Sequence, residues 1–210
     1  MATSARPLLL CCAVLLATAC TRLVDGSALP AFGAAPNASA VDVDEILLDR
    51  AQMRAITGAG DHLSIIPTMD TKSPVDIDTL ARTTPAECRF VFAETLTFGP
   101  EVEQFHKTTF QHPPKGATIS EGVAAYRNTD TARRAFDDLV AGVQDCAAGR
   151  FGWLFVGEWA ADGDSLHTRR GRCGRDYRVT SIVLIEVTFC AFPESVPEIV
   201  MTNIEANVGG

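Results

Sequence analysis

The sequence lacks the short motifs that mark common catalytic sites. It contains no G-x-S-x-G, H-E-x-x-H, phosphate-binding loop or dinucleotide fingerprint, and no spacing of its Asp, Glu, Ser and His residues brings a nucleophile and a base together. It has no C-x-x-C pair for zinc. Basic charge is also scarce, because 18 Lys and Arg stand against 26 Asp and Glu, which argues against nucleic acid as a partner. We therefore expect a protein that is not an enzyme and has no cofactor and no metal.

The sequence also lacks an apolar run long enough to span a bilayer permanently. The run at residues 8–16 follows a single charge, Arg6, and is typical of a secretory signal. It ends in Ala17-Thr18-Ala19-Cys20, and small residues before Cys form a bacterial lipobox. We predict a signal peptide at residues 1–19 and a diacylglycerol anchor on Cys20, which places the protein at the extracytoplasmic face of the cell membrane. The alternative is an ordinary signal cut nearby, with Cys20 incidental.

Residues 20–40 predict a lipidated cysteine followed by a flexible tether. They are rich in Ala, Pro, Gly and Ser and have no helical or strand period. A flexible chain of this length reaches about 25 Å on average. Without residues 1–19 the chain keeps 17 basic and 26 acidic residues, so no basic patch assists binding to an anionic membrane and attachment rests on the lipid.

Residues 41–208 predict one folded domain. Apolar periodicity and capping residues predict helices over residues 44–58, 85–95, 130–149 and 195–208. The expected caps are Asp44 for the first helix, Thr129 or Asp130 for the third, and a capping box from Ser195 to Glu198 for the last. Strands are expected over residues 62–66, 102–110, 119–126, 151–159 and 165–169, with a hairpin turn at residues 162–164. Residues 68–84 are rich in turn formers.

The most β-branched stretch of the chain lies between Cys173 and Cys190. As one straight strand it would hold the two cysteines about 50 Å apart, at roughly 3.3 Å per residue. A disulfide tolerates only about 4.4–6.8 Å between the two Cα atoms. If these cysteines are bonded, the stretch must therefore fold back near Ser181 and Ile182 as an antiparallel hairpin.

Several polar and aromatic groups allow a functional and a structural interpretation. Asp70, Asp76 and Asp78 invite calcium but lack the spacing of an EF-hand loop, so a solvated loop is favoured. His106 and His112 have no third metal ligand nearby. Two further groups stay open. The aromatics of the expected 151–159 strand form either a stacking platform for a ligand or a face of the core: Phe151, Trp153, Phe155 and Trp159. The basic cluster that follows forms either an anion-binding site or a solvated strand edge: Arg169, Arg170, Arg172, Arg175 and Arg178.

Four cysteines remain after lipidation and removal of the signal: Cys88, Cys146, Cys173 and Cys190. In an oxidising compartment they predict two disulfides rather than a zinc site. Three pairings are possible. One of them, 88–146 with 173–190, would join the helical half internally and clamp the hairpin.

These cysteines also carry a family resemblance. The order is Pro85-x-x-Cys88, a strand leading into a capped helix that ends in Cys146, Cys173-x16-Cys190, and a final amphipathic helix. It resembles the mycobacterial PknH-like extracellular sensor domain over residues 41–208. That domain occurs at the outer end of a receptor serine/threonine kinase and in stand-alone actinobacterial lipoproteins.

The resemblance implies an α+β domain: an antiparallel β-sheet with helices packed on it, an open cleft for an unidentified ligand, and disulfides Cys88–Cys146 and Cys173–Cys190. The family usually has Asn near the hairpin turn, where this chain has Thr180-Ser181-Ile182, so the resemblance leaves the register of the hairpin open.

The function expected from these observations is ligand binding by a sensor-type, non-catalytic extracytoplasmic domain. The expected partners are the membrane, through the lipid anchor, and an unidentified envelope ligand or protein partner. The alternative is a lipid or glycolipid carrier, and an envelope hydrolase ranks third. A sensor predicts a solvent-open cleft with a polar lining, whereas a carrier predicts a closed apolar cavity.

Overall fold

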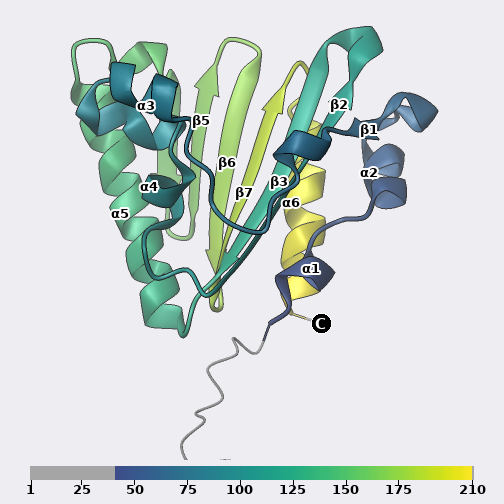
Figure 1. The fold of residues 1–210 in the computed structure, drawn as a ribbon, viewed down its shortest axis with the longest axis horizontal. Helices are drawn as coiled ribbons and strands as arrows, with labels where there is room; N and C mark the ends of the chain where they lie inside the picture. Colours follow the sequence, from purple (N-terminus) through teal and green to yellow (C-terminus); the bar gives the residue numbers. More distant parts are fainter. Residues whose placement is uncertain (1–40, 210) are drawn as a thin grey trace, which may run out of the picture. The chain divides into compact units, whose positions relative to one another are not determined.

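A computed structural model describes residues 41–209 (Figure 1). Within these residues lies a seven-stranded sheet in the order β1-β2-β3-β7-β6-β5-β4, and every neighbouring pair of strands is antiparallel. The strands are β1 (Ser64–Ile65), β2 (Gln104–His112), β3 (Ala117–Ala125), β4 (Glu158–Asp162), β5 (Ser165–Arg170), β6 (Cys173–Thr180) and β7 (Val183–Cys190). The expected α+β fold with an antiparallel sheet is confirmed.

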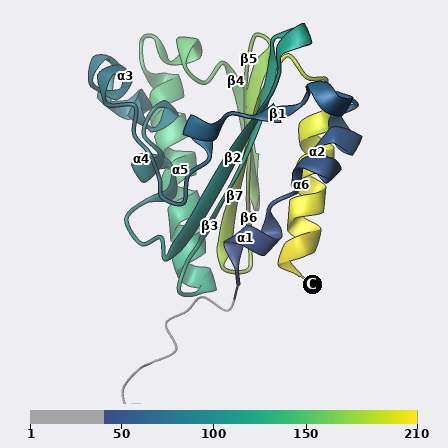
Figure 2. The same ribbon diagram turned by 45° about the vertical axis from the view of Figure 1, so that its right-hand side comes forward.

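Helices cover both faces of the sheet, with α6 on one side and α5 on the other (Figure 2). Successive side chains of a strand point to opposite faces, so each strand contributes to two cores. On β7, Val183, Ile185 and Val187 belong to the core under α6, whereas Leu184 belongs to the core under α5. Among the described residues, the buried members of both cores lie between Val43 and Ile204.

The first face is covered by α1 (Val43–Ile46), α2 (Arg50–Thr57) and α6 (Ser195–Val208). The single helix expected over 44–58 is wrong, because the chain breaks at Leu47–Asp49. The backbone N–H of Leu48 donates to the buried carboxylate of Glu121 instead of continuing a helix (3.1 Å). Asp42 caps α1 and Asp49 caps α2 with a capping box, so Asp44 is not the cap.

The final helix begins at Ser195 as expected, but the capping box is wrong. Glu194 precedes the helix, and no side chain forms a capping hydrogen bond there. The helix is held by its buried side, which includes Val196, Val200 and Ile204.

The opposite face is covered by α5 (Thr129–Ala148), which buries Phe136, Leu139 and Val143 in the predicted period. Its cap is Asn128, which accepts from the N–H of Thr131 (2.9 Å), rather than Thr129 or Asp130. Beside α5 the chain forms the 3-10 helix η3 (Ala86–Val91) and α4 (Glu94–Phe98), where one helix was expected over 85–95, and α3 (Asp78–Thr83) within the stretch expected to be rich in turns. The disulfide Cys88–Cys146 joins η3 to α5.

Residues 173–190 form the predicted hairpin. Thr180 lies opposite Val183 across a turn at Ser181 and Ile182, and Ser181 adopts a positive φ of 53°. Cys173 lies directly opposite Cys190, with their Cα atoms 4.0 Å apart, and the two are bonded. The structure therefore contains the pairing that the family resemblance implied and defines the register that it left open.

The strand expected over 151–159 is wrong. Residues Gly152–Leu154 form a 3-10 turn, and β4 begins only at Glu158. A Cβ atom at Gly152 would lie 1.8 Å from the carbonyl oxygen of Cys146, so the turn packs directly on the end of α5. Phe151 and Trp153 are 49% and 67% exposed and lie outside the core, whereas Phe155 and Trp159 are partly buried and pack against the core under α5. The four aromatics do not share one strand, so no stacking platform forms, and the core-face interpretation holds for two of them.

A candidate ligand-binding cleft

The sheet face under α5 carries a row of polar side chains that crosses five strands. The strand registers place these residues directly opposite one another, in the order Thr109, Ser120, Thr188, Arg175 and Thr168. The hydroxyls of Thr109 and Ser120 are buried and hydrogen-bonded to each other (2.8 Å). Thr188 and Arg175 are only partly buried, so the middle of the row is the part that a ligand can reach.

The next row of the same face is charged. Lys107 on β2 lies opposite Gly122 on β3, which in turn lies opposite Glu186 on β7. Because Gly122 has no side chain, the stem of Lys107 passes over it, and Nζ lies 2.7 Å from Oε2 of Glu186. The same Nζ lies 2.8 Å from Oε1 of Glu94 on α4. The ion pairs thus join the sheet to α4.

Neighbouring groups keep this charged row ionised. Burial by itself would raise the pKa of Glu186, but Lys107 and then Arg175 hold that pKa below its usual value. Burial would lower the pKa of Lys107, whereas Glu186 and Glu94 raise it above its usual value. Tyr177 donates its hydroxyl to Oε1 of Glu186 (3.0 Å). Lys107 and Glu186 therefore stay charged as a pair at neutral pH.

Two adjoining hollows lie over these rows, and together they form the cleft. The larger has a volume of about 340 Å³ and the smaller about 220 Å³. Val91, Phe92, Arg175 and Thr188 line both. The larger extends over Lys107, Glu94 and Ser120, and the smaller over Thr168, Arg170 and the Cys173–Cys190 disulfide.

A strap formed by residues 70–77 crosses the sheet beside the larger hollow (Figure 1). At one end Thr71 exchanges two backbone hydrogen bonds with Lys107 (both 2.9 Å). Further along, the N–H of Val75 donates to Oε2 of Glu94 (2.8 Å), and Asp76 accepts from the backbone N–H and hydroxyl of Thr95. Glu94 thus contacts both the strap and Lys107.

The family is shown by a comparison with protein-family models. The model of the PknH-like extracellular domain matches residues 38–205. The chain belongs to this family. The crystal structure of the extracellular domain of PknH from Mycobacterium tuberculosis superposes with a TM-score of 0.59 at 12% sequence identity, covering 80% of this chain and 97% of that one. This likeness shows the shared fold. No curated protein matches the chain.

The PknH-like domain keeps apart His106 and His112, the two histidines for which a metal-binding role was considered and not favoured. His106 lies between Asp44 and Asp70, with its ring nitrogens 2.8 Å and 2.9 Å from the two carboxylates. His112 lies elsewhere, stacked between His62 and Phe192. Over residues 41–209 no group of three or more His, Cys, Asp or Glu side chains is arranged to hold a metal ion.

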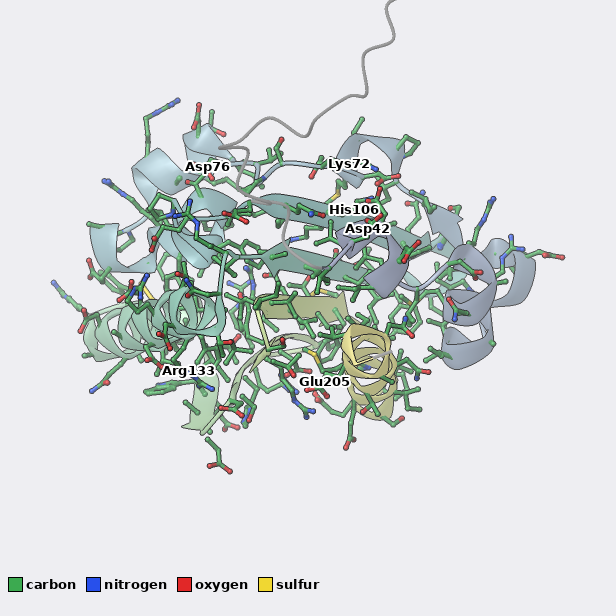
Figure 3. All side chains as sticks on the ribbon, turned by 90° about the horizontal axis from the view of Figure 1, so that it is seen from below. Asp42, Lys72, Asp76, His106, Arg133 and Glu205 are labelled. Atoms are coloured by element: carbon green, nitrogen blue, oxygen red, sulfur yellow. A yellow bond between two sulfur atoms is a disulfide. The ribbon has the colours of Figure 1, made fainter. Side chains whose placement is uncertain are left out.

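Asp44 also pairs with Lys72, and Figure 3 shows Lys72 and His106 gathered beside Asp42, the residue that caps α1. Lys72 and then His106 lower the pKa of Asp44 against the opposing effect of burial. The calcium interpretation fails in the same region, because Asp70, Asp76 and Asp78 have separate partners, His106, Thr95 and Arg82.

The basic cluster is divided between the two faces of the sheet. Arg170 and Arg175 line the cleft. On the other face, Arg169 pairs with Asp176 (2.6 Å) and Glu194 (2.8 Å), and Arg178 pairs with Glu205 (2.5 Å). Arg169 and Arg178 lie on interior strands of the sheet and are ion-paired, so the solvated-edge interpretation does not fit them, and the anion-site interpretation is left for Arg170 and Arg175 in the cleft.

Lys107, Glu94 and Glu186 were not predicted as site residues. The one available signal was Glu186, a charged residue within the otherwise apolar run from Val183 to Val187. Its partner Lys107 lies 79 residues earlier, and no pattern in the sequence joins the two.

Proposed function

We propose that the protein is a cell-envelope lipoprotein, anchored to the extracytoplasmic face of the membrane through Cys20, whose PknH-like domain binds a ligand in the cleft without catalysing a reaction. The domain organisation in this proposal is a signal peptide at 1–19, a lipidated Cys20 with a tether to residue 40, and the sensor domain from 41 to 208. Over residues 41–209 no helix combines the length and the apolar character needed to cross a membrane.

The observation that carries the proposal is the chemistry of the cleft. It is open to solvent, and the floor under it consists of hydroxyls, a guanidinium and an ion-paired lysine. Buried ion pairs are costly to desolvate, and they add specificity rather than stability in several systems. A carrier for acyl chains would need an enclosed apolar cavity. The polar floor therefore favours a sensor over a lipid or glycolipid carrier.

The position of the cleft agrees with this role. The first residues of the domain meet the sheet at Gln104, whose side chain accepts from the N–H of Val43. Gln104 is paired with Ala125, and Ala125 with Val183, at one end of the strands. The Cys173–Cys190 bond, which lines the cleft, lies at the other end of the strands. The cleft therefore lies at the end of the strands away from the start of the described domain, where an envelope ligand can reach it.

A blocking substitution tests the proposal. Thr188 lines both hollows, so Thr188→Phe should fill their junction and abolish the ligand-induced rise in melting temperature. Thr202→Phe places the same side chain on the exposed side of α6 and should leave this rise unchanged. The measurement is a thermal-shift screen with fragments of the cell envelope, followed by native mass spectrometry of the hits.

Two results would contradict the proposal. The first is that every stabilising fragment acts equally on both variants, which would place binding outside the cleft. The second is a wild-type protein that co-purifies with a lipid of two or more acyl chains fully enclosed by the fold, which would favour the carrier; binding of a single-chain anion in the open cleft would not.

A further inference from the structure

The charges around the cleft have the opposite sign to the protein as a whole. Its lining contains Lys107, Arg170 and Arg175 and a single acid, Glu94. With Glu186 included, which contacts Lys107 and Arg175 from below, one positive charge is still in excess. The whole chain has a formal charge of −8. The cleft is therefore a local site at which an anion is favoured over a cation.

Arg175 is the group best placed to bind that anion. It lines both hollows, and its side chain is 28% exposed. One of its nitrogens, Nη2, donates to the carbonyl of Val91 (2.7 Å), and Nη1 lies 3.6 Å from Oε1 of Glu186, beyond hydrogen-bond distance. A guanidinium carries five N–H groups in a planar fork that fits a carboxylate or a phosphate. The partly buried hydroxyl of Thr188, directly opposite, adds a further donor.

The larger hollow adds an apolar surface next to this cation. Phe90, Val91 and Phe92 of the η3 segment line it on one side. Met69, Val75 and Ile77 line it from the strap and the turn before it, and they are 45%, 46% and 50% exposed. Covering apolar side chains is favourable in proportion to the area removed from water. A purely polar ligand would leave these apolar side chains exposed to water, whereas a ligand with an apolar part would cover them.

We propose that the cleft binds an amphipathic anion, with its carboxylate or phosphate at Arg175 and its apolar chain under the strap. This inference rests on the proposed function, because it requires the cleft to be a ligand site. A neutral amphiphile would bring no charge to pair with the guanidinium, whose contact to Glu186 is longer than a hydrogen bond, and a cationic one would be repelled by it.

The probes are decanoate and decyl phosphate, with decyl maltoside and decyltrimethylammonium as matched controls of the same chain length. Binding is measured by calorimetry on the unlipidated mature chain, residues 21–210, below the aggregation concentration of each probe. We expect both anions to bind and both controls to bind at least tenfold more weakly. From octanoate to dodecanoate the affinity should rise about fourfold per methylene group.

Three variants locate the two parts of the ligand. Arg175→Gln should lower the affinity for decanoate at least tenfold, whereas Arg172→Gln, at an exposed position outside the lining, should not change it. Ile77→Ser, at an exposed position of the strap, should flatten the dependence on chain length and leave the fold intact. Because Ile77→Ser does not alter Arg175, this variant still tests the inference if Arg175→Gln disturbs folding.

The outcomes separate this inference from the proposed function. Equal binding of decyl maltoside and decanoate, or an equal loss in Arg172→Gln and Arg175→Gln, would overturn the amphipathic anion. If another class of ligand then binds and is blocked by Thr188→Phe, the cleft remains a ligand site and only its assigned ligand is wrong. If no ligand of any class is sensitive to Thr188→Phe, both proposals fail.

Discussion

Glu121 lies on the sheet face opposite the cleft, with no exposed surface, among the apolar side chains under α6. Its Oε2 accepts from the N–H of Leu48, and its Oε1 is buried without a hydrogen-bond partner among the described residues. Burial raises the pKa of Glu121 to about 8 from a usual value of 4.5. The folded state therefore binds this proton more tightly than the unfolded state. The resulting stabilisation is complete below about pH 4.5 and is lost as pH rises through about 8.

The substitution Glu121→Gln should remove this pH dependence. Glutamine keeps an oxygen for the N–H of Leu48 and cannot ionise, although its amide N–H groups then lack partners. Between pH 5 and pH 8 the free energy of unfolding of the wild type should fall by roughly 2–4 kcal/mol relative to that of the variant. Urea denaturation at several pH values measures this difference. Parallel stability curves for the two proteins would show that Glu121 does not titrate in this range.

Lys107 supports a second prediction about a single side chain. Lys107→Met should leave Glu186, whose side chain is 2% exposed, with the Tyr177 hydroxyl and the longer contact to Arg175 as its remaining partners, and removing one partner of a buried pair costs about 3–5 kcal/mol. Replacing Glu186 by Gln in the same chain should recover much of this loss, which a double-mutant cycle in denaturant would measure. The control Lys72→Met removes an exposed partner of Asp44 and should change stability little. A loss as large for Lys72 as for Lys107 would contradict this account.

Among the elements, the hairpin over residues 173–190 was predicted correctly and the structure of residues 151–159 was not. Cys173 and Cys190 end a β-branched run, so both strand propensity and the disulfide favour the same fold. In residues 151–159, alternating aromatics favoured a strand, but Gly152 packs on the carbonyl of Cys146 and Gly157 adopts a positive φ of 62°. The packing of Gly152 on the end of α5 is a tertiary contact, and it overrides the local preference of the aromatic residues for a strand.

Two glycines near α5 should respond in opposite directions to the same substitution. At Gly152 a Cβ atom would lie 1.8 Å from a backbone oxygen, so Gly152→Ala should destabilise the domain by at least about 2 kcal/mol. At Gly142, within α5, the nearest atom to a Cβ would be 3.9 Å away, so Gly142→Ala should stabilise it by about 0.5–1 kcal/mol. Thermal unfolding of both variants measures the two effects. A melting temperature that rises in both would show that the 152–154 turn is not packed as described.

At the scale of the whole molecule, the fold class could be predicted and the residues that line the cleft could not. Strand and helix periods predicted the individual elements, four cysteines predicted two disulfides, and the family resemblance implied the α+β fold with an open cleft. The cleft depends on the register of five strands, which places Thr109 of β2 and Thr168 of β5 in one row. No local pattern records that row, because its members come from segments far apart in the chain.

The anchor is the last property of the whole molecule that can be tested. Cys20 and the residues before it lie outside the described residues, so the lipid anchor stays a prediction from Ala17-Thr18-Ala19-Cys20. Cys20→Ala should move the protein from the membrane fraction to the culture supernatant. Several acyl chains hold a protein far more firmly than one, and no basic patch replaces them. Cys12→Ala, within the signal peptide, should leave the protein in the membrane. Mass spectrometry of the N-terminal peptide should find diacylglycerol on Cys20 of the wild type, and a Cys20→Ala protein that stays in the membrane would overturn the anchor.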